Sequence, residues 1–424
     1  MLDSYLPPQK FGFRRHVGTQ DAIHVVMSEI ERRLASSEGM TYAIFIDCQK
    51  AFDLAPRQRM INAFKKAGVN GQLLKVIESF YQEDHLQINV GGQMYVDTIQ
   101  NRGTPQGDPL SWSGFSLLLA ELPKKVTEEC RTGTIAMFAD DIIITHRNRG
   151  QLQLMLNIVS DHLEEEGLHL NPSKTMVMKI RRGGHLNRSD RITWKGKPLE
   201  FVPTAKYLGI RLQTTGTCFT EHIDEVCCKN VAIMYAETGD PYKLSVSTAV
   251  KLFYIKALPK LSYGMGRLRK HLTLRNLQTY EKCFCAYLKR VLRVARNARN
   301  RYLYVLADLE IPFVEVMRVT LRAEQTEEFC AFVNEWKAKV EEARKSLDGD
   351  PILQRRKEWS AQMYARRHVF TRYLVHDYHD QLCSVESFHE PTESCVCRFC
   401  GQMCIKYHAM MCEARPGLDN LGCT

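Results

Sequence analysis

The sequence predicts an α+β fold, in which an antiparallel sheet with helices packed on one face is followed by a mostly helical region. Two observations lead to this prediction. Short apolar runs rich in β-branched residues alternate with amphipathic helical stretches up to about residue 215, and several of these runs form hairpins. From Glu221 the helical pattern continues to about Leu292, and it resumes between Phe313 and Lys345.

The elements of the first region follow from helix caps, apolar strands and Gly or Pro breaks. Thr19 is expected to cap a helix over residues 21–36, and a buried strand over residues 42–46 ends at Asp47. The next expected elements are helices at 57–67 and 73–81, a hairpin at 86–98, a helix at 110–128 that bends or breaks near Pro123, a hairpin around Asp140, a helix at 149–166 that ends at Gly167, and strands within 168–180, 192–199 and 206–212.

Composition and charge indicate a globular protein with a polyanionic partner. The 424 residues are 44% hydrophobic and 25% charged, enough for roughly two to three domains with sizeable cores. The net charge of +10 favours a polyanion such as nucleic acid. No apolar run reaches the ~18 residues that span a bilayer, and the first ten residues lack the apolar core of a signal peptide. We therefore expect an intracellular protein, nuclear or cytoplasmic, whose 15 Cys are thiols or metal ligands.

Two adjacent carboxylates, Asp140 and Asp141, interrupt the apolar run from Ile135 to Thr145. Aspartate is a poor strand former, and a buried carboxylate is costly unless it is paired or binds a metal. The flanking residues therefore predict two short strands with the Asp pair at the turn of a tight hairpin. A carboxylate pair on such a turn suits a hard divalent cation. A solvated acidic turn is the alternative interpretation.

Asp47 is the second acidic position of interest, because it ends an apolar strand 93 residues before Asp140. Two strands of one sheet could bring these carboxylates together, although sequence spacing alone does not show that they meet. Carboxylates in this arrangement can hold two Mg²⁺ ions about 4 Å apart. One ion would lower the pKa of an attacking 3′-hydroxyl and the other would stabilise the leaving pyrophosphate. Phosphoryl transfer needs little else from a protein beyond positioning and charge stabilisation.

Six short motifs resemble those of reverse transcriptases, in the order of that family. Five stretches resemble the palm motifs, in this order: Phe45-Ile46-Asp47 with Ala51-Phe52-Asp53, residues 104–110 (TPQGDPL), Phe138-Ala139-Asp140-Asp141, Gly167-Leu168 with residues 171–175 (NPSKT), and Tyr207-Leu208-Gly209. Residues 9–14 and 19–23 resemble the fingers motif that precedes the palm. The alanine in the third palm motif and the QGDPL form of the second are similar to the enzymes of non-LTR retrotransposons.

This resemblance implies an RNA-directed DNA polymerase with a right-hand architecture. A primer 3′-hydroxyl would attack the α-phosphate of a dNTP on an RNA template, and in the family the DNA primer is often a nicked chromosomal target strand. The implied regions are partial fingers and palm in residues 1–215, a helical thumb in 216–310, a helical linker in 311–390 and a zinc-knuckle tail in 391–424. No membrane partner is implied, and the oligomeric state stays undefined.

Matching positions imply the catalytic residues. Asp47, Asp140 and Asp141 would bind the two Mg²⁺ ions, whereas Asp53 would be structural because it lies six residues past Asp47. Phe52 would be a steric gate, whose ring crowds a ribonucleotide 2′-hydroxyl and so favours dNTPs. An ordinary core aromatic is the alternative for Phe52.

Four further positions would bind substrate. Gln106 and Gly107 would shape the floor under the template and the incoming nucleotide, and a simple turn leading into a helix is the alternative. Arg14 would contact the triphosphate through charge-assisted hydrogen bonds. Lys174 would assist protonation of the pyrophosphate. For both Arg14 and Lys174 an exposed surface charge is the alternative. The hairpin at 207–209 would be the primer grip, or a plain β-turn.

The tail has the spacing of a tetrahedral zinc site, C-x2-C-x7-H-x3-C, formed by Cys397, Cys400, His408 and Cys412. Short metal-nucleated knuckles commonly bind single strands or nucleic-acid ends. Cys395 and Cys404 offer rival ligands, and unrelated Cys residues are the alternative. The order of the four ligands, Cys-Cys-His-Cys, resembles the knuckle of site-specific non-LTR retrotransposons, which often insert into ribosomal RNA genes. In that family the gap between His and the last Cys is usually one residue longer.

Other interpretations of the whole chain stay open. The basic stretch between Tyr287 and Tyr302 would follow a phosphate backbone in a thumb, or be a solvated face. Because the chain begins inside the fingers motif and stops just beyond the knuckle, we expect a fragment of a larger element protein or a degraded copy. An inactive or domesticated nucleic-acid-binding remnant and a group II intron maturase are the rival functions. The intact motif carboxylates argue against the first rival and the knuckle argues against the second.

Overall fold

A computed structural model describes residues 2–82, 85–99, 102–105, 107–182, 190–216, 218–237, 246–292, 294 and 296–347. The chain divides into two compact units between Phe219 and Thr220. Gln106 and the expected zinc ligands lie outside the described residues. None of the helices that are described is both long enough and apolar enough to cross a bilayer.

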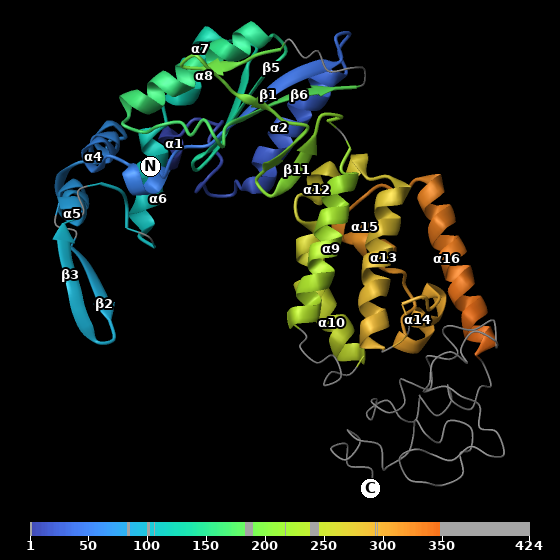
Figure 1. Ribbon diagram of the computed structural model, residues 1–424. Helices are drawn as coiled ribbons and strands as arrows, with labels where there is room; N and C mark the ends of the chain where they lie inside the picture. The colour runs from blue at the N-terminus through green and yellow to red at the C-terminus, as the bar shows by residue number, and fades with distance from the viewer. Residues whose placement is uncertain are drawn as a thin grey trace. The chain divides into compact units, whose positions relative to one another are not determined.

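The first unit is built on a five-stranded sheet with the order β4-β5-β1-β6-β9 (Figure 1). Its strands are β1 (Met40–Ile46), β4 (Thr134–Phe138), β5 (Asp141–His146), β6 (Met176–Arg181) and β9 (Glu200–Phe201). Strand β1 lies in the middle, antiparallel to β5 and β6, whereas β9 runs parallel to β6. Because both faces of β1 are covered, its run TYAIFI is buried without polar alternation.

Helices cover both faces of this sheet. Ile44, Ile46 and Ile142 join the main apolar core with α4 (Arg57–Lys66), α6 (Pro109–Leu118), α7 (Leu122–Glu129) and α8 (Arg149–Glu165). Ala43 and Phe45 point to the opposite face, since alternate strand residues face opposite sides. Helix α2 (Thr19–Leu34) packs against β1 and β4 on that side (Figure 1). The expectation of helices on one face only is therefore wrong.

One helix break agrees with the expectation and one helix start differs from it. The helix expected over residues 110–128 breaks near Pro123 as predicted, into α6 and α7, which are separated just ahead of that proline. Proline suits the first turn of a helix, where a missing N–H costs nothing, so Pro123 helps begin α7. Thr19 is the first residue of α2 rather than its cap. The helix is capped instead at Gly18, whose N–H donates to the carboxylate of Asp21 at 2.9 Å.

Shorter elements complete the first unit around the sheet. They are α1 (Leu2–Tyr5), α3 (Ala51–Leu54), α5 (Gly71–Gln82), β2 (His85–Val90), β3 (Gln93–Ile99), β7 (Thr193–Trp194), β8 (Lys197–Pro198), β10 (Thr204–Tyr207) and β11 (Ile210–Gln213). The strand pairs β2–β3, β7–β8 and β10–β11 each form a separate two-stranded sheet. The alternating apolar pattern predicts the first of these as a hairpin.

The described part of the second unit is helical, as expected. Its helices are α9 (Thr220–Glu237), α10 (Val246–Lys256), α11 (Leu258–Ser262), α12 (Met265–Leu268), η2 (Arg269–His271), α13 (Leu274–Val291), α14 (Asn300–Ala307), α15 (Phe313–Leu321) and α16 (Glu327–Ser346). Aromatic rings fill its core. The ring centroids of Phe284 lie 5.0 Å from Phe253 and 4.8 Å from Phe313, within the range of favourable aromatic pairs.

A buried carboxylate in the middle of α13 holds the start of α15. Glu281 accepts a hydrogen bond from the backbone N–H of Val314 at 2.9 Å and another from the hydroxyl of Tyr304. The Tyr304 oxygen in turn accepts from the N–H of Phe313 at 2.9 Å. These bonds satisfy N–H groups that a helix start leaves unpaired. Burial raises the pKa of Glu281 above its usual value, although the hydrogen bonds oppose this shift.

Replacement of Glu281 by Gln should therefore change how stability depends on pH. A raised folded-state pKa means that the folded protein binds this proton more tightly, so the free energy of unfolding falls as pH rises above the ordinary value of 4.5. Urea unfolding at several pH values should show the wild type losing stability relative to Glu281→Gln as pH increases.

The matched control is Glu315→Gln, because the bond from Arg318 at 2.7 Å lowers the pKa of Glu315. The Glu315 carboxylate stabilises the folded protein above its ordinary pKa, and this stabilisation is lost as pH falls. The wild type should therefore gain stability relative to Glu315→Gln as pH rises, the opposite of the trend for Glu281→Gln. The same pH dependence of the stability difference for Glu281→Gln and for Glu315→Gln, each relative to the wild type, would contradict this account.

Candidate active site

Strand pairing brings the two expected acidic sites next to each other. Strand β1 pairs with β5 so that Ile46 lies opposite Ile142, and one more step of this register sets Asp47 opposite Asp141. Residues directly opposite each other in an antiparallel pair point to the same face of the sheet. Because Ile46 and Ile142 point into the main core, the two carboxylates lie on the other face.

The turn between β4 and β5 contains only Ala139 and Asp140, because Phe138 pairs with Asp141. Asp141 therefore begins a strand instead of sharing the turn with Asp140 as expected. Ala139 has a φ of 56°, in the left-handed region that residues with a side chain rarely adopt. Such a conformation persists only where the surrounding structure holds it, and it is typical of functional sites.

The N-terminal segment braces this turn from the edge of β4. The N–H of Phe11 donates to the Met137 carbonyl at 2.8 Å, and the N–H of Met137 donates to the Gln9 carbonyl at 2.9 Å. At Gly12 a Cβ atom would lie 2.6 Å from the backbone nitrogen of Ala139. Only glycine allows this approach. The motif assigned from sequence to the fingers thus lies directly against the acidic hairpin.

The fourth palm motif braces Asp47 from the other side. Asn171 donates its side-chain amide to the Asp47 carboxylate at 3.1 Å and its N–H to the Asp47 carbonyl at 2.8 Å. The N–H of Asp47 donates to the hydroxyl of Thr175 at 3.3 Å. These contacts tie the end of β1 to the segment that precedes β6, so both the backbone and the carboxylate of Asp47 are held by residues 171–175.

The three carboxylates form one electrostatic cluster. Desolvation and the charge of Asp47 raise the pKa of Asp140, which is half-buried. Desolvation and the charges of Asp140 and Asp47 raise the pKa of Asp141, although its side chain is exposed. Burial and the same three charges raise the pKa of the Cys48 thiol to about 12. Gathered like charges of this kind favour a cation among them.

A divalent cation fits this cluster by ligand type. Carboxylate oxygens are the ligands that Mg²⁺ prefers, and a cation would offset the repulsion that raises the pKa values. Within the described ranges, however, no three His, Cys, Asp or Glu side chains are grouped so that they could hold a metal ion. The structure therefore brings Asp47, Asp140 and Asp141 to one end of the sheet without closing them into a ligand set.

Phe52 and the loop before α6 lie close together. The half-buried ring of Phe52 has its centroid 4.5 Å from that of Phe115, and its carbonyl accepts from the N–H of Thr104 at 2.9 Å. At Gly103 a Cβ atom would lie 2.4 Å from the carbonyl oxygen of Asp53. The loop therefore rests directly on α3. Gly107 is exposed with a φ of 92°, which favours glycine.

Arg14 and Lys174 are the other residues expected to contact substrate. The Arg14 guanidinium donates to the Asp3 carboxylate at 2.9 Å and to the carbonyls of Pro7 and Lys10 at 3.0 and 3.2 Å. Arg14 thus closes the N-terminal segment, and its contact with a triphosphate stays a prediction. Lys174 is exposed and lies within the segment that braces Asp47, between Asn171 and Thr175.

Tyr207 belongs to the hairpin expected to be the primer grip. Its side chain is buried, and burial together with the charge of Asp141 raises its pKa. The hydroxyl has no hydrogen-bond partner among the described residues. Its ring centroid lies 6.4 Å from that of Phe45 in β1, so this hairpin packs on the face that carries the carboxylates.

Sequence reasoning missed Lys10. Its side chain is buried, its ammonium donates to the Ser116 carbonyl at 2.8 Å, and burial lowers its pKa to about 7. Its backbone bridges to Met137 in β4, two residues before the Ala139–Asp140 turn. The local sequence around Lys10 predicts an exposed charge. The side chain is buried because this segment pairs with β4, and the local sequence does not show that pairing.

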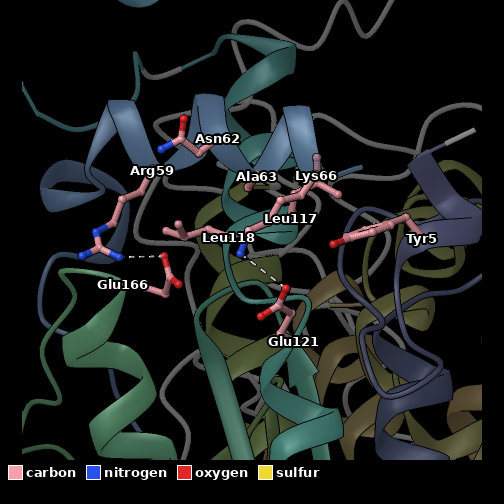
Figure 2. A pocket seen from close by; sticks show the side chains of 9 residues that line it. All are labelled: Tyr5, Arg59, Asn62, Ala63, Lys66, Leu117, Leu118, Glu121 and Glu166. Carbon is pink, nitrogen blue, oxygen red and sulfur yellow. Dashed lines mark hydrogen bonds and ion pairs between the residues drawn. The ribbon is translucent and has the colours of Figure 1, made fainter. Parts of the chain in front are cut away.

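A separate cavity of about 130 Å³ lies between α4 and α6 (Figure 2). Ala63, Leu117 and Leu118 are among the residues that line it, whereas the rim carries the ion pairs Arg59–Glu166 and Lys66–Glu121, each at 3.5 Å. The charges on the rim thus neutralise each other. None of the predicted site residues lines this cavity, so it is distinct from the acidic cluster.

A family model and two curated relatives agree with the motifs. The model of the reverse transcriptase family (RNA-dependent DNA polymerase) matches residues 1–212, half of the chain. The chain is 28% identical to the Pol polyprotein of the retrotransposable element R2 of Popillia japonica, over 46% of this chain and 34% of that protein. It is 26% identical to the RNA-directed DNA polymerase from mobile element jockey of Drosophila melanogaster, over 61% of this chain and 29% of that protein. Apo telomerase of Candida tropicalis is 13% identical over 85% of this chain and 58% of that chain, with a TM-score of 0.41.

The chain therefore belongs to the reverse transcriptase family, with a fold of mixed helices and sheet. Its similarity to the R2 and jockey proteins confirms the more specific prediction from the motifs, a reverse transcriptase of a non-LTR retrotransposon. The chain spans about a third of the length of these curated relatives.

Substitution of Gly12 by Ala should weaken the acidic hairpin. Because the added Cβ would meet the backbone of Ala139 rather than a flexible side chain, the turn or the N-terminal segment must shift. Overpacking of this kind costs about 1–3 kcal/mol in the free energy of unfolding, which urea denaturation would measure. Gly266→Ala is the control, since its Cβ would have nothing within 4 Å. Equal stability of the two variants would contradict the close approach.

Proposed function

We propose that this chain is the polymerase part of an RNA-directed DNA polymerase used in target-primed retrotransposition. It would extend the 3′-hydroxyl of a DNA primer with dNTPs on an RNA template. The observation that carries this proposal is the register of β1 and β5, in which Ile46 lies opposite Ile142, so that Asp47 ends β1 at the same edge of the sheet where Asp140 and Asp141 join β4 to β5. The family match and the net charge of +10 support nucleic acid as the partner.

We infer that the three carboxylates have different roles. Reverse transcriptases generally use divalent metal ions, and Asp47 and Asp140 are the proposed ligands of two Mg²⁺ ions, with Asp141 as a third ligand or as a group that orients its neighbour. When bound, the ions would activate the primer hydroxyl and stabilise the leaving pyrophosphate. The protein's own part is to hold the carboxylates in place through Asn171 and Thr175 on one side and residues 9–12 on the other.

The substrate contacts are proposed from the motifs. The half-buried Phe52 ring would exclude a ribonucleotide 2′-hydroxyl, and its fixed position against Phe115 suits such a role. Gln106 and Gly107 would lie under the template and the incoming nucleotide, and the exposed backbone at Gly107 would allow close approach. Arg14 and Lys174 would contact the triphosphate and the pyrophosphate.

In the same proposal the two units correspond to partial fingers and palm, and to a helical thumb followed by a linker. The helices of the second unit support this assignment, because a thumb is expected to be helical. Its basic residues would follow the phosphate backbone and make binding weaker at high salt.

Asp140→Ala should abolish nucleotide incorporation, because a metal ligand at the reacting phosphate cannot be replaced by a methyl group. Primer extension on poly(rA)/oligo(dT) with Mg²⁺ measures this, and RNA binding and zinc content should stay unchanged. Asp161→Asn, which alters an exposed acid on α8, should retain activity. Residual polymerisation by Asp140→Ala would overturn the metal assignment. A wild-type chain that binds RNA but incorporates nothing would favour the inactive, nucleic-acid-binding remnant.

The tail is proposed to bind one structural Zn²⁺ through Cys397, Cys400, His408 and Cys412. Cys400→Ser should lose the metal, since three ligands hold zinc far less tightly than four. Elemental analysis of the purified chain should then find about one zinc in the wild type and close to none in this variant. Cys404→Ser, a rival ligand in the same tail, should keep its zinc. Retention by Cys400→Ser with loss by Cys404→Ser would show that the ligand set is wrong.

A further inference from the structure

Two large aromatic side chains are exposed beside the acidic hairpin. Phe13 is 46% exposed and Trp112 is 41% exposed, although their ring centroids lie only 4.8 Å apart. The Phe13 ring is also 6.4 Å from that of Phe138, the residue that precedes the turn. Most exposed apolar side chains occur singly. An exposed pair that continues into the acidic hairpin is therefore unusual.

The two rings are held in place by contacts of their own. The indole N–H of Trp112 donates to the Asp108 carbonyl at 2.8 Å, which satisfies the one polar atom of that ring and fixes its direction. Asp108 is itself fixed, because its carboxylate caps α6 by accepting from the N–H of Leu110 at 3.0 Å. Trp112 is thus oriented before any ligand arrives, which lowers the entropy cost of binding.

Phe13 is exposed at the expense of an unfavourable backbone. Its φ is 61°, in the left-handed region. Gly12 on one side is pressed against Ala139, and Arg14 on the other donates to the carbonyls of Pro7 and Lys10. A strained residue that turns an aromatic ring toward solvent, instead of burying it, suggests a ligand for that ring.

The position of the pair indicates the ligand. One ring belongs to the segment that braces the Ala139–Asp140 turn, and the other to α6, directly after the loop that rests on Phe52. The chain is strongly basic, with +10 net charge, and the exposed Arg15 lies two residues beyond Phe13. Flat, polarisable bases match an aromatic surface, because every base has a π-face that can stack. The positive net charge of the chain favours a ligand that also carries phosphate.

We propose that Phe13 and Trp112 form a stacking platform for an unpaired nucleobase at the edge of the polymerase site. The base comes from the single-stranded template or from a free nucleotide. Stacking is tolerant of sequence, so the platform holds any base. This inference rests on the proposed function for its biological meaning, whereas its test measures binding and does not depend on incorporation.

The test uses the full chain in the Asp140→Ala background, so that no turnover occurs. Phe13→Leu and Trp112→Leu keep an apolar side chain but remove the stacking ring, and Trp112→Phe keeps a ring. Phe80→Leu is the matched control, because Phe80 is 60% exposed on α5 and belongs to no part of the site. Binding of a fluorescently labelled oligo(rA) is followed by anisotropy, and binding of dTTP by competition and by quenching of tryptophan fluorescence.

Each Leu variant should weaken binding of at least one ligand roughly tenfold, the effect expected for one lost base stack. Trp112→Phe should restore the affinity while losing most of the quenching, and Phe80→Leu should bind like the parent. Weakened oligo(rA) binding identifies the template strand as the source of the base, and weakened dTTP binding identifies the free nucleotide.

Three results would overturn the platform. They are parent-like binding of both ligands by the two Leu variants, failure of Trp112→Phe to restore affinity, and quenching that persists in Trp112→Phe. The two proposals fail separately. If dTTP quenches the tryptophan fluorescence as described, but the chain with Asp140 intact incorporates no nucleotide, the platform stands and the polymerase function is wrong. If the chain incorporates nucleotides, but its Leu variants bind oligo(rA) and dTTP like the parent, the polymerase function stands and the platform is wrong.

Discussion

The register between β1 and β5 is the constraint on which the site depends. Ile44, Ile46 and Ile142 are buried in the main core, and their burial fixes which residues of the two strands lie opposite each other. A slip of one residue would turn these side chains to the opposite face and carry Asp47 into the apolar core. Burying an unpaired carboxylate there would cost several kcal/mol. The hydrophobic core thus positions the acidic residues without touching them.

Local sequence patterns predict the elements of this arrangement better than its contacts. The run TYAIFI is apolar enough to predict a buried strand, and Gly167, with a φ of 75°, ends α8 as its place after the helical pattern suggests. The covering of the second sheet face by α2 could not be predicted, because an amphipathic helix shows that it packs but not where. Whether Asp140 and Asp141 share the turn depends on the partner of Phe138, which no local pattern specifies.

The least predictable part of the site is the segment from Gln9 to Arg14. Lys10 is buried, Gly12 is too close to Ala139 for any side chain, and Phe13 has a left-handed backbone. All three residues lie in or directly after a segment that bridges to Met137 in β4, more than 120 residues away in the sequence. The resemblance to a known motif marked the segment as important. It did not indicate the physical reason, which is close contact with the acidic turn.

Several unfavourable features gather at this one place: three neighbouring carboxylates, of which Asp140 and Asp141 have raised pKa values, a buried lysine whose pKa is lowered, and strained backbone at Phe13 and Ala139. A structure selected for stability alone would place few of these together, whereas catalytic sites commonly do. The N-terminal segment links them, since residues 9–12 support the turn that carries Asp140 and Phe13 extends from that support toward Trp112. A shift of this segment would therefore displace Asp140, the proposed metal ligand, and the aromatic pair together, which would couple the proposed base stacking to the position of the acidic turn.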